Sequence, residues 1–562
     1  MDKHKVNIKA ILLTLIMTPL FFACTSKTTD EYLYRVTYTA DDLNDKYDLS
    51  SVETVQFSND TIQYDGVKAT VSDQILTILE AGDYLIEGNL DEGQIIVNTN
   101  QKSDVRLIFN NVSITNSSQS PIIITQADKV IITLVENSIN RLIDHSKQAK
   151  SNDEVNASIY CKATLSINGL GSLNIESDYK HGIHSKDGLK ILSATIKITS
   201  KQDGIKGKDY VGIKDAYIEI DCDNDGIQSD NATEINKGFV DIENTNATIN
   251  AGLDAIQAVN SIDLSSGSYH IKSGLSASDN DSGKGLKSGN TLNISQAEVI
   301  IDSLDDGIHS NNTLIIDQSN IVVSSKTDAL YATKSITLSE NDITIVKADE
   351  GIESEIITIN SGNIVINAIK NGINAVNEAF KTDDKHAQNQ DKNDGSKFIF
   401  NDGEITINSL GDGIDSNGDI LMKSGNLVIY GPTIPNDGAI DYNGTFVYED
   451  GLLIALGSIE MAQYPSSANQ NVVLIEFSQR LTQGGVIQIV DQSNHAILSI
   501  NTTKVVQALV FGSSNLKKGD YSVSFTSNVQ LEESYLLNGE SLDGRELGTF
   551  TIEKSTTLYQ IR

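Results

Sequence analysis

The chain has 562 residues, and its 42 Lys and Arg against 76 Asp and Glu give a net charge of −34. This charge argues against nucleic acid or an anionic membrane surface as a partner, so a membrane would be contacted only through a lipid anchor. Gly is abundant at 41 residues, Pro is scarce at five and Trp is absent, which favours strands and turns and argues against a helical bundle.

The first 23 residues have the pattern of a signal peptide. Three lysines precede an apolar run, Ala10–Ala23, which is too short to span a bilayer as a mature helix. The five residues that end at Cys24, LFFAC, resemble a bacterial lipobox, in which the cysteine becomes lipid-modified. We therefore expect residues 1–23 to be removed, Cys24 to be lipidated and residues 24–50 to form a tether. The protein would be a membrane lipoprotein facing the extracytoplasmic side, with plain secretion or an uncleaved anchor as alternatives.

A short motif recurs from residue 181 onward: a residue that is usually acidic, then Gly or Ala, then Ile or Leu. Successive copies are 22, 22, 29, 30, 22, 22, 22, 21, 41 and 26 residues apart, so the basic period is about 22. The aliphatic members of the eleven copies are Ile183, Ile205, Ile227, Ile256, Leu286, Ile308, Leu330, Ile352, Ile373, Ile414 and Ile440.

Each period contains two or three short alternating strands between turn residues, and none has a helix-length apolar pattern. Such a unit cannot bury its own apolar face, but units stacked at ~4.8 Å form a right-handed parallel β-helix. The aliphatic members would then form an internal ladder, and the Gly or Ala before each would stand where a side chain crowds the turn. A β-propeller is the main rival, but its blades need roughly 40 residues.

The exceptional steps and the loss of the period define the domains. We predict a parallel β-helix with an N-terminal cap over residues 51–445, interrupted by an exposed, mobile insertion at about 380–397. From 446 to 562 the period vanishes, and strand-like runs indicate a C-terminal β-rich domain, either a small sandwich or a capping sheet.

The position two before the ladder residue is acidic in seven of the eleven copies. Consecutive coils would hold these carboxylates about 5 Å apart without a matching row of Lys or Arg, and a divalent cation would relieve the repulsion. Oxygen-only surroundings favour calcium. The alternative is that Asp-Gly is a turn dipeptide whose carboxylate accepts local backbone N–H groups.

The richest acidic patch, Asp221–Gly226, reproduces the first half of a calcium loop, but Ala232 stands where the bidentate Glu is required. An EF-hand is therefore excluded, and a local carboxylate cluster remains. The predicted calcium ligands are Asp203, Asp221, Asp223, Asp225 and Asp254, with secondary candidates Asp281, Asp305 and Asp306.

Enzymatic activity is an alternative to binding alone. A pectate-type polysaccharide lyase needs calcium to neutralise the uronate carboxylate and a base to remove the neighbouring proton, and a depressed lysine pKa would suit that base. The candidate bases are Lys206, Lys208, Lys284 and Lys287. The leading interpretation needs no catalytic residue, and a structural adhesin or spacer is a third possibility.

Several motifs in order resemble the bacterial carbohydrate-binding domain-containing protein family between about residues 75 and 530. They are ASIYCK at 157–162, LSINGLG at 165–171, DGIKGKD at 203–209, GDGIDSNG at 411–418 and AIDYNG at 439–444. The resemblance implies a surface-anchored, right-handed parallel β-helix that binds plant-type polysaccharides, notably acidic pectic sugars and cellulose, without established cleavage. It also implies calcium sites similar to those of polysaccharide lyase family nine, with Asp203, Asp225 and Asp254 as ligands. The expected partner is thus a uronate-containing polysaccharide bound by a monomer.

Overall fold

The computed structural model describes residues 33–146, 154–278, 281–380, 392–553 and 558–561. The predicted signal peptide, Cys24 and most of the predicted insertion lie outside these residues. The described part contains one short α-helix, α1 (Ala40–Leu43), one 3-10 turn, η1 (Glu378–Phe380), and otherwise strands. None of its helices is long and apolar enough to cross a membrane. The predicted all-β class is confirmed.

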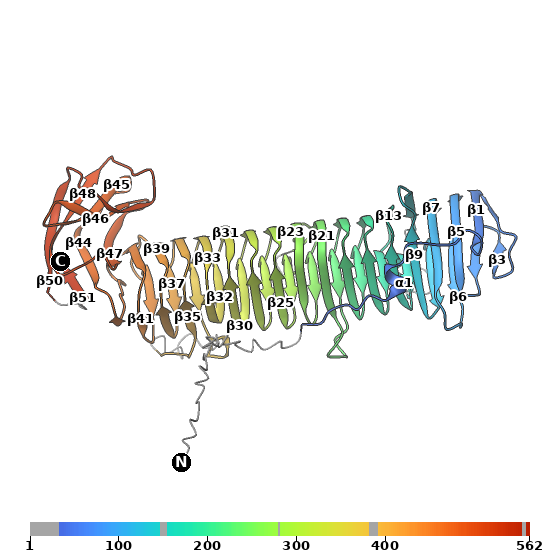
Figure 1. Ribbon diagram of the computed structural model, residues 1–562, viewed down its shortest axis with the longest axis horizontal. Helices are drawn as coiled ribbons and strands as arrows, with labels where there is room; N and C mark the ends of the chain where they lie inside the picture. The colour runs from blue at the N-terminus through green and yellow to red at the C-terminus, as the bar shows by residue number, and fades with distance from the viewer. Residues whose placement is uncertain (1–32, 147–153, 279–280, 381–391, 554–557, 562) are drawn as a thin grey trace, which may run out of the picture. The chain divides into compact units, whose positions relative to one another are not determined.

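Most strands pair in parallel with a strand one repeat further along the chain, and the pairs build three stacks (Figure 1). Stack one consists of β4 (Ile75–Ile78), β6 (Gln94–Asn98), β8 (Ile122–Gln126), β11 (Ala157–Cys161), β14 (His181–Ser185), β17 (Ile205–Gly207), β20 (Ile227–Ser229), β22 (Ile256–Ala258), β24 (Leu286–Ser288), β27 (Ile308–Ser310), the first parts of β30 (Leu330–Ser339) and β32 (Ile352–Ile359), β34 (Ile373–Ala375), β37 (Ile414–Ser416) and β40 (Ile440–Tyr442).

Long strands bend from stack two into stack three, and each supplies one part to each stack. These shared strands are β5 (Gly82–Asp91), β7 (Val105–Asn116), β21 (Phe239–Ala251) and β23 (Ile262–Ser273). Stack two adds β9 (Lys129–Leu134), β12 (Thr164–Asn168), β15 (Gly188–Leu192), β18 (Tyr210–Lys214), β25 (Thr291–Ser295), β28 (Thr313–Asp317), the second parts of β30 and β32, β35 (Lys397–Phe400), β38 (Asp419–Met422) and β41 (Phe446–Tyr448). Stack three adds β10 (Ile139–Asp144), β13 (Ser172–Ser177), β16 (Thr195–Ser200), β19 (Tyr217–Cys222), β26 (Glu298–Ser303), β29 (Asn320–Ser325), β31 (Asn341–Ala348), β33 (Gly362–Ala368), β36 (Glu404–Ser409), β39 (Asn426–Tyr430) and β42 (Leu452–Gly457).

The aliphatic ladder is confirmed as the centre of the core. Ile205 pairs with Ile227 and Ile227 with Ile256, and all three are fully buried. Burial of each such side chain contributes roughly 1.5–3 kcal/mol. The crowding at the preceding residue is also confirmed, because a Cβ on Gly226 would lie 2.4 Å from Ile249 Cγ2 and 2.5 Å from the Ala255 carbonyl oxygen.

The two ends of the stacks are closed differently. At the N-terminal end β1 (Glu53–Asn59) forms an antiparallel pair with β2 (Thr61–Gln63), and β3 (Ala69–Ser72) pairs antiparallel with β4. At the other end β42 still pairs in parallel with β39, so the stacks reach Gly457 and the predicted boundary at 445 is too early.

The C-terminal region is β-rich, as predicted. β44 (Val472–Leu481) and β47 (Val506–Gly512) extend the large sheet beside β42, with β51 (Leu558–Ile561) next to β44. A separate antiparallel sheet has the order β49-β46-β45-β48-β50 and packs on them through a second apolar core. Its strands are β49 (Tyr535–Glu540), β46 (His495–Asn501), β45 (Gly485–Asp491), β48 (Gly519–Ser527) and β50 (Arg545–Ile552).

The predicted tether needs a correction. Residues Leu33–Asn44, which we call the strap, lie against the outward side of stack two. In the sequence, residues 25–32 separate Cys24 from the strap.

Candidate functional site

Two rows of polar residues run along stack one, and we call them together the stripe. The inner row, two positions before each ladder residue, comprises His181, Asp203, Asp225, Asp254, Lys284, Asp306, Asp328, Glu350, Asn371 and Asp412. The outer row, one position after each ladder residue, is fixed by strand register and comprises His184, Lys206, Gln228, Gln257, Lys287, His309, Tyr331, Glu353, Asn374, Asp415 and Asp441.

Six inner-row side chains accept a hydrogen bond from the backbone amide that opens the next copy of the motif. The donor–acceptor pairs are Asp203 N to His181 Nδ1 (3.1 Å), Asp254 N to Asp225 Oδ1 (3.0 Å), Lys284 N to Asp254 Oδ1 (2.8 Å), Asp328 N to Asp306 Oδ1 (3.2 Å), Asp412 N to Asn371 Oδ1 (3.0 Å) and Gly438 N to Asp412 Oδ1 (2.5 Å). These amide donors hold one oxygen of Asp225, Asp254, Asp306 and Asp412 in place.

Outer-row side chains contact the second oxygen of the inner-row carboxylates. Gln228 Nε2 donates to Asp225 Oδ2, and Lys287 Nζ lies 2.9 Å from Asp254 Oδ2. Further along, His309 Nδ1 lies 2.7 Å from Asp306 Oδ2. The stripe is therefore a connected network of carboxylates and nitrogen donors.

Cations do accompany the acidic row, contrary to the expectation from the sequence. Lys206 Nζ lies 3.6 Å from Asp203 and 2.8 Å from Asp230, while Lys284 Nζ lies 2.8 Å from Asp305. Lys284 belongs to the inner row and Lys206 to the outer row. The prediction failed because it considered one position of the repeat at a time, whereas strand register brings two positions together.

The cations divide the stripe electrostatically. Burial would raise the pKa of Asp203, but His181 and Lys206 hold that pKa below its ordinary value. Asp306 behaves in the same way, because His309 and Lys284 outweigh its burial and lower its pKa. These two carboxylates are therefore charged at neutral pH.

Other stripe carboxylates have raised pKa values. Burial, together with Asp203 and Asp254, raises the pKa of Asp225 to about 7. Burial, with Asp306 as the next contribution, raises the pKa of Asp328 to about 8, and burial raises that of Asp412 to about 7. These carboxylates are therefore partly protonated near neutral pH, and a bound cation would compete with the proton.

The structure brings only some of the predicted calcium ligands together. Asp203, Asp225 and Asp254 are buried neighbours in successive coils. Asp221 and Asp223 are exposed: Asp221 accepts a hydrogen bond from Asn250 (2.7 Å), and Asp223 pairs with Lys201 (3.1 Å).

The secondary candidates for calcium ligands, Asp281, Asp305 and Asp306, are also engaged in hydrogen bonds or ion pairs. Asp281 accepts hydrogen bonds from Ser278 in its own loop, while Asp305 and Asp306 pair with Lys284. Within the described ranges, no group of three or more His, Cys, Asp or Glu side chains is arranged to hold a metal ion. Calcium binding stays a prediction.

The lysines proposed as lyase bases are mostly bound to carboxylates. Asp306 and Asp305 outweigh burial and raise the pKa of Lys284, which is the opposite of what a general base requires. Lys206 and Lys287 make the ion pairs given above, and Lys208 lies in the turn after β17. The expected lowering of the pKa is therefore wrong for Lys284.

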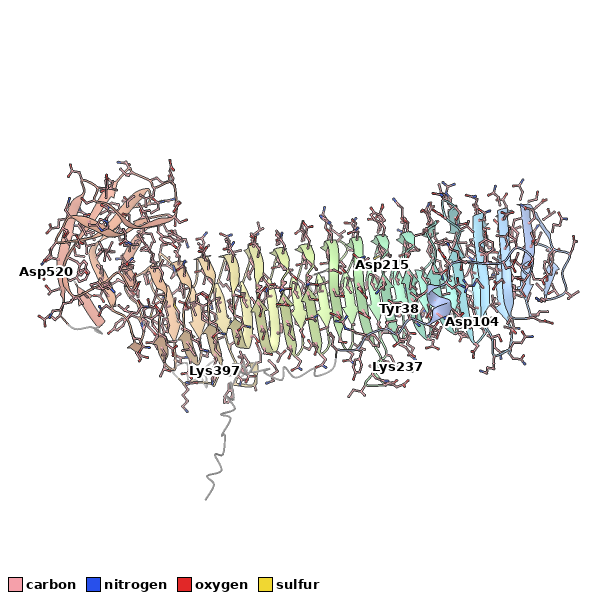
Figure 2. All side chains as sticks on the ribbon, in the orientation of Figure 1. Tyr38, Asp104, Asp215, Lys237, Lys397 and Asp520 are labelled. Carbon is pink, nitrogen blue, oxygen red and sulfur yellow. The ribbon has the colours of Figure 1, made fainter. Side chains whose placement is uncertain are left out.

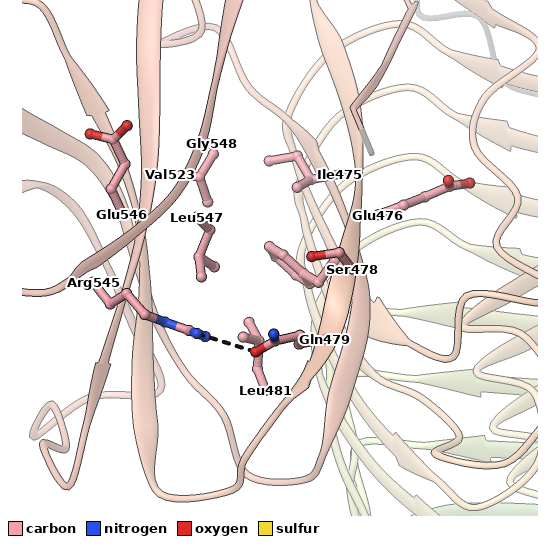
Figure 3. Close-up of a pocket in the computed structure, with 11 residues that line it drawn as sticks. Ile475, Glu476, Ser478, Gln479, Leu481, Val523, Arg545, Glu546, Leu547 and Gly548 are labelled. Carbon is pink, nitrogen blue, oxygen red and sulfur yellow. Dashed lines mark hydrogen bonds between the residues drawn. The ribbon is translucent and has the colours of Figure 1, made fainter.

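A small cavity of about 150 Å³ lies in the C-terminal domain, away from the stripe (Figure 3). Apolar and polar side chains of β44, β48 and β50 line it, and Arg545 Nη1 donates to Gln479 Oε1 (3.2 Å) at one side. The cavity contains no inner-row or outer-row residue.

Part of the chain is similar to proteins described as carbohydrate-binding. Residues 72–329 match a family model described as "Carbohydrate-binding domain-containing protein". A relative of the same description from Acetivibrio thermocellus is 31% identical over 148 residues, which are 26% of this chain and 52% of the relative. The chain thus spans about half the length of that curated relative. A similar solved structure is that of the polysaccharide lyase-like protein from C. thermocellum, as a gadolinium derivative. The two chains are 30% identical, with a TM-score of 0.40, and the alignment covers 43% of this chain and 96% of the other.

Proposed function

We propose that this chain is a calcium-dependent protein that binds acidic, pectic polysaccharide along the stripe of a right-handed parallel β-helix. The main support is that the matched segment, residues 72–329, contains the part of the stripe where nitrogen donors and buried carboxylates alternate. Both rows repeat at the coil spacing of ~4.8 Å, so a linear polymer along the stack would meet similar groups at each coil.

The polar groups of the outer row suit a sugar acid better than they suit a flat neutral glycan. Lys206, Gln228, Gln257 and Lys287 offer N–H donors to carboxylates and hydroxyls. The ring of Tyr331 stacks on His309, with centroids 4.6 Å apart and planes 13° apart, so one face of Tyr331 is already covered. Recognition in this proposal therefore depends on hydrogen bonds and charge rather than on aromatic platforms.

Calcium would join the uronate carboxylate to the buried acids. Asp225, whose pKa is raised by burial and by Asp203 and Asp254, is the group at which a divalent cation would displace a proton. The three carboxylates supply fewer oxygens than the six to eight that calcium takes, so the sugar and water would complete the shell. This explains why binding would require both calcium and an acidic sugar.

The protein would act as an exported, lipid-anchored monomer. The signal-peptide pattern and the lipobox-like residues before Cys24 support this location. Binding is favoured over cleavage because three of the four candidate bases, Lys206, Lys284 and Lys287, are paired with carboxylates.

Affinity electrophoresis in gels containing polygalacturonate, alginate or a neutral glucan, with calcium or with chelator, tests the proposal. We expect retardation by polygalacturonate in calcium only. The double variant Gln257→Ala/Lys287→Met should lose it, whereas Lys370→Met, which changes a lysine paired with Asp349 outside the stripe, should keep it. Retardation that ignores chelator, or its absence with every uronate polymer, would contradict the proposal.

A further inference from the structure

The strap follows the length of stack two rather than crossing it. Its contacts reach from Arg35, 2.5 Å from Asp263 on β23, to the carbonyl of Asn44, which accepts a hydrogen bond from Arg106 on β7. Between them the backbone amide of Val36 donates to Asp241 on β21 (2.7 Å). Figure 1 shows the strap and α1 lying along these coils, and Figure 2 labels Tyr38 within it.

The surface beneath the strap is built to receive a chain. Strand register aligns Ser166, Lys190, Gly212, Asp241 and Asp263 in one outward row. A Cβ on Gly212 would lie 2.7 Å from Val36 Cγ2, so the absence of a side chain gives the strap its room. The row is therefore a groove that fits a linear chain parallel to the stack.

Asp42 occupies a cationic cradle in this groove. Its carboxylate is fully buried and lies 2.6 Å from Lys129 Nζ and 2.8 Å from Lys190 Nζ. The hydroxyl of Ser166 donates to the same carboxylate (2.5 Å). A buried carboxylate is stable only when cations and donors surround it in this way.

The cradle belongs to the stack and not to the strap. Lys129, Ser166 and Lys190 come from β9, β12 and β15, three successive strands of stack two. Two lysines are directed at one point in a chain with a net charge of −34, and the only other carboxylate within ion-pair distance of Lys129 in the described part is that of Asp104, at 3.9 Å. Their chemistry matches a carboxylate on any linear chain, not only one on the protein.

We propose that Lys129, Ser166 and Lys190 form a second, calcium-independent subsite for the carboxylate of a short acidic oligosaccharide, and that the strap closes it with Asp42 as an internal competitor. Only the identity of the sugar acid rests on the proposed function. The acidic end of the groove, Asp241 and Asp263, is matched by Arg35 and would repel a long polyanion, so the ligand is short.

Carboxylate rescue of an emptied cradle tests this. Asp42→Gly should melt at a lower temperature than the wild type, and acetate should restore part of the loss, while chloride at equal ionic strength should not. Acetate should not rescue Asp42→Gly/Lys190→Met, which lacks one cation. Lys214→Met, a change to a lysine of the same stack that pairs with Glu243, should leave the rescue of Asp42→Gly intact.

Ligand binding is measured in chelator with trigalacturonate and with the matched neutral trisaccharide. We expect Asp42→Gly and the isosteric Asp42→Asn to bind trigalacturonate at least about tenfold more tightly than the wild type, and the Lys190→Met double variant to lose the gain. Folded variants that show neither rescue by acetate nor binding of trigalacturonate would overturn the proposal. An Asp42→Gly variant that stays unfolded in acetate would also overturn it if Asp42→Asn binds no trigalacturonate. Because chelator is present throughout, failure of calcium-dependent binding at the stripe leaves this result unaffected.

Discussion

The backbone amide of Asp254 donates a hydrogen bond to Oδ1 of Asp225, which lies 29 residues earlier in the chain and 3.0 Å away. The carboxylate of an Asp-Gly pair therefore bonds to the following coil and not only to its own turn. One oxygen has a structural role, and the other faces the outer row, where Gln228 donates to it. This combination explains how the same residue can be both a turn former and a candidate ligand.

The first prediction links calcium to stability at this carboxylate. If Asp203, Asp225 and Asp254 share an ion, calcium should stabilise the wild type by about 2.7 kcal/mol at a hundredfold excess over Kd. Asp225→Ala should lose most of that increment, because the site then falls further below the oxygen number that calcium prefers. Melting curves in calcium and in chelator measure the difference.

The matched control for this prediction is Asp349→Ala, which removes a carboxylate paired with Lys370 elsewhere on the stacks. It should respond to calcium as the wild type does. A wild type whose melting temperature is the same in calcium and chelator would mean that the aspartate row serves only the fold.

The second prediction concerns pH and Asp328. Burial and Asp306 raise its pKa from 3.8 to about 8, so between these values the folded state holds a proton that the unfolded state has lost. Stability in chelator should then fall as pH rises from about 4 to 8, by at most about 1.4 kcal/mol per pH unit for this group. Asp328→Asn should flatten that slope in urea unfolding, whereas Asp402→Asn, at an exposed turn, should leave it unchanged.

The parts of the fold that the sequence predicts are those that repeat. The aliphatic residues from Ile183 to Ile440 recur with a basic period of about 22 and a few longer steps, and strand pairing places each over the next. The Asp-Gly motif does not mark the end of the stacks at Gly457, because β42 is a continuous, fully buried apolar run that pairs with β39 without that motif.

Contacts without a period are not visible in the sequence. Asp42 meets Lys190 at a separation of 148 residues, and Val36 meets Asp241 at 205, and no pattern in residues 33–44 indicates either partner. The outer row had a signal, since its members share one place after the ladder residue. That signal is weak because its residue types vary from Lys and Gln to Asp.

A third prediction tests the close packing of the coils at Gly226. Gly226→Ala would push a methyl group against Ile249 and the Ala255 carbonyl, so it should destabilise the fold by roughly 1–3 kcal/mol. Gly548→Ala, where a Cβ would meet no atom within 4 Å, is the control and should change stability little. Equal unfolding free energies for the two variants in urea would show that the coils relax around the added methyl.

The fourth prediction concerns the attachment of the C-terminal domain through Lys504. Its Nζ donates to the carbonyls of Tyr430 (2.8 Å) and Gly431 (3.1 Å) at the end of stack three, and also to that of Ser409. Burial lowers its pKa from 10.5 to about 8, so between these values the unfolded state binds the extra proton. Stability from this group should therefore rise as pH increases from 8 to 10.5.

Lys504→Met should abolish that rise and leave the three carbonyls without their shared donor, which lowers the melting temperature at pH 7. Lys518→Met, at an exposed position of the same domain, should behave as the wild type, and a Lys504→Met profile parallel to the wild type across this pH range would refute the role given to Lys504.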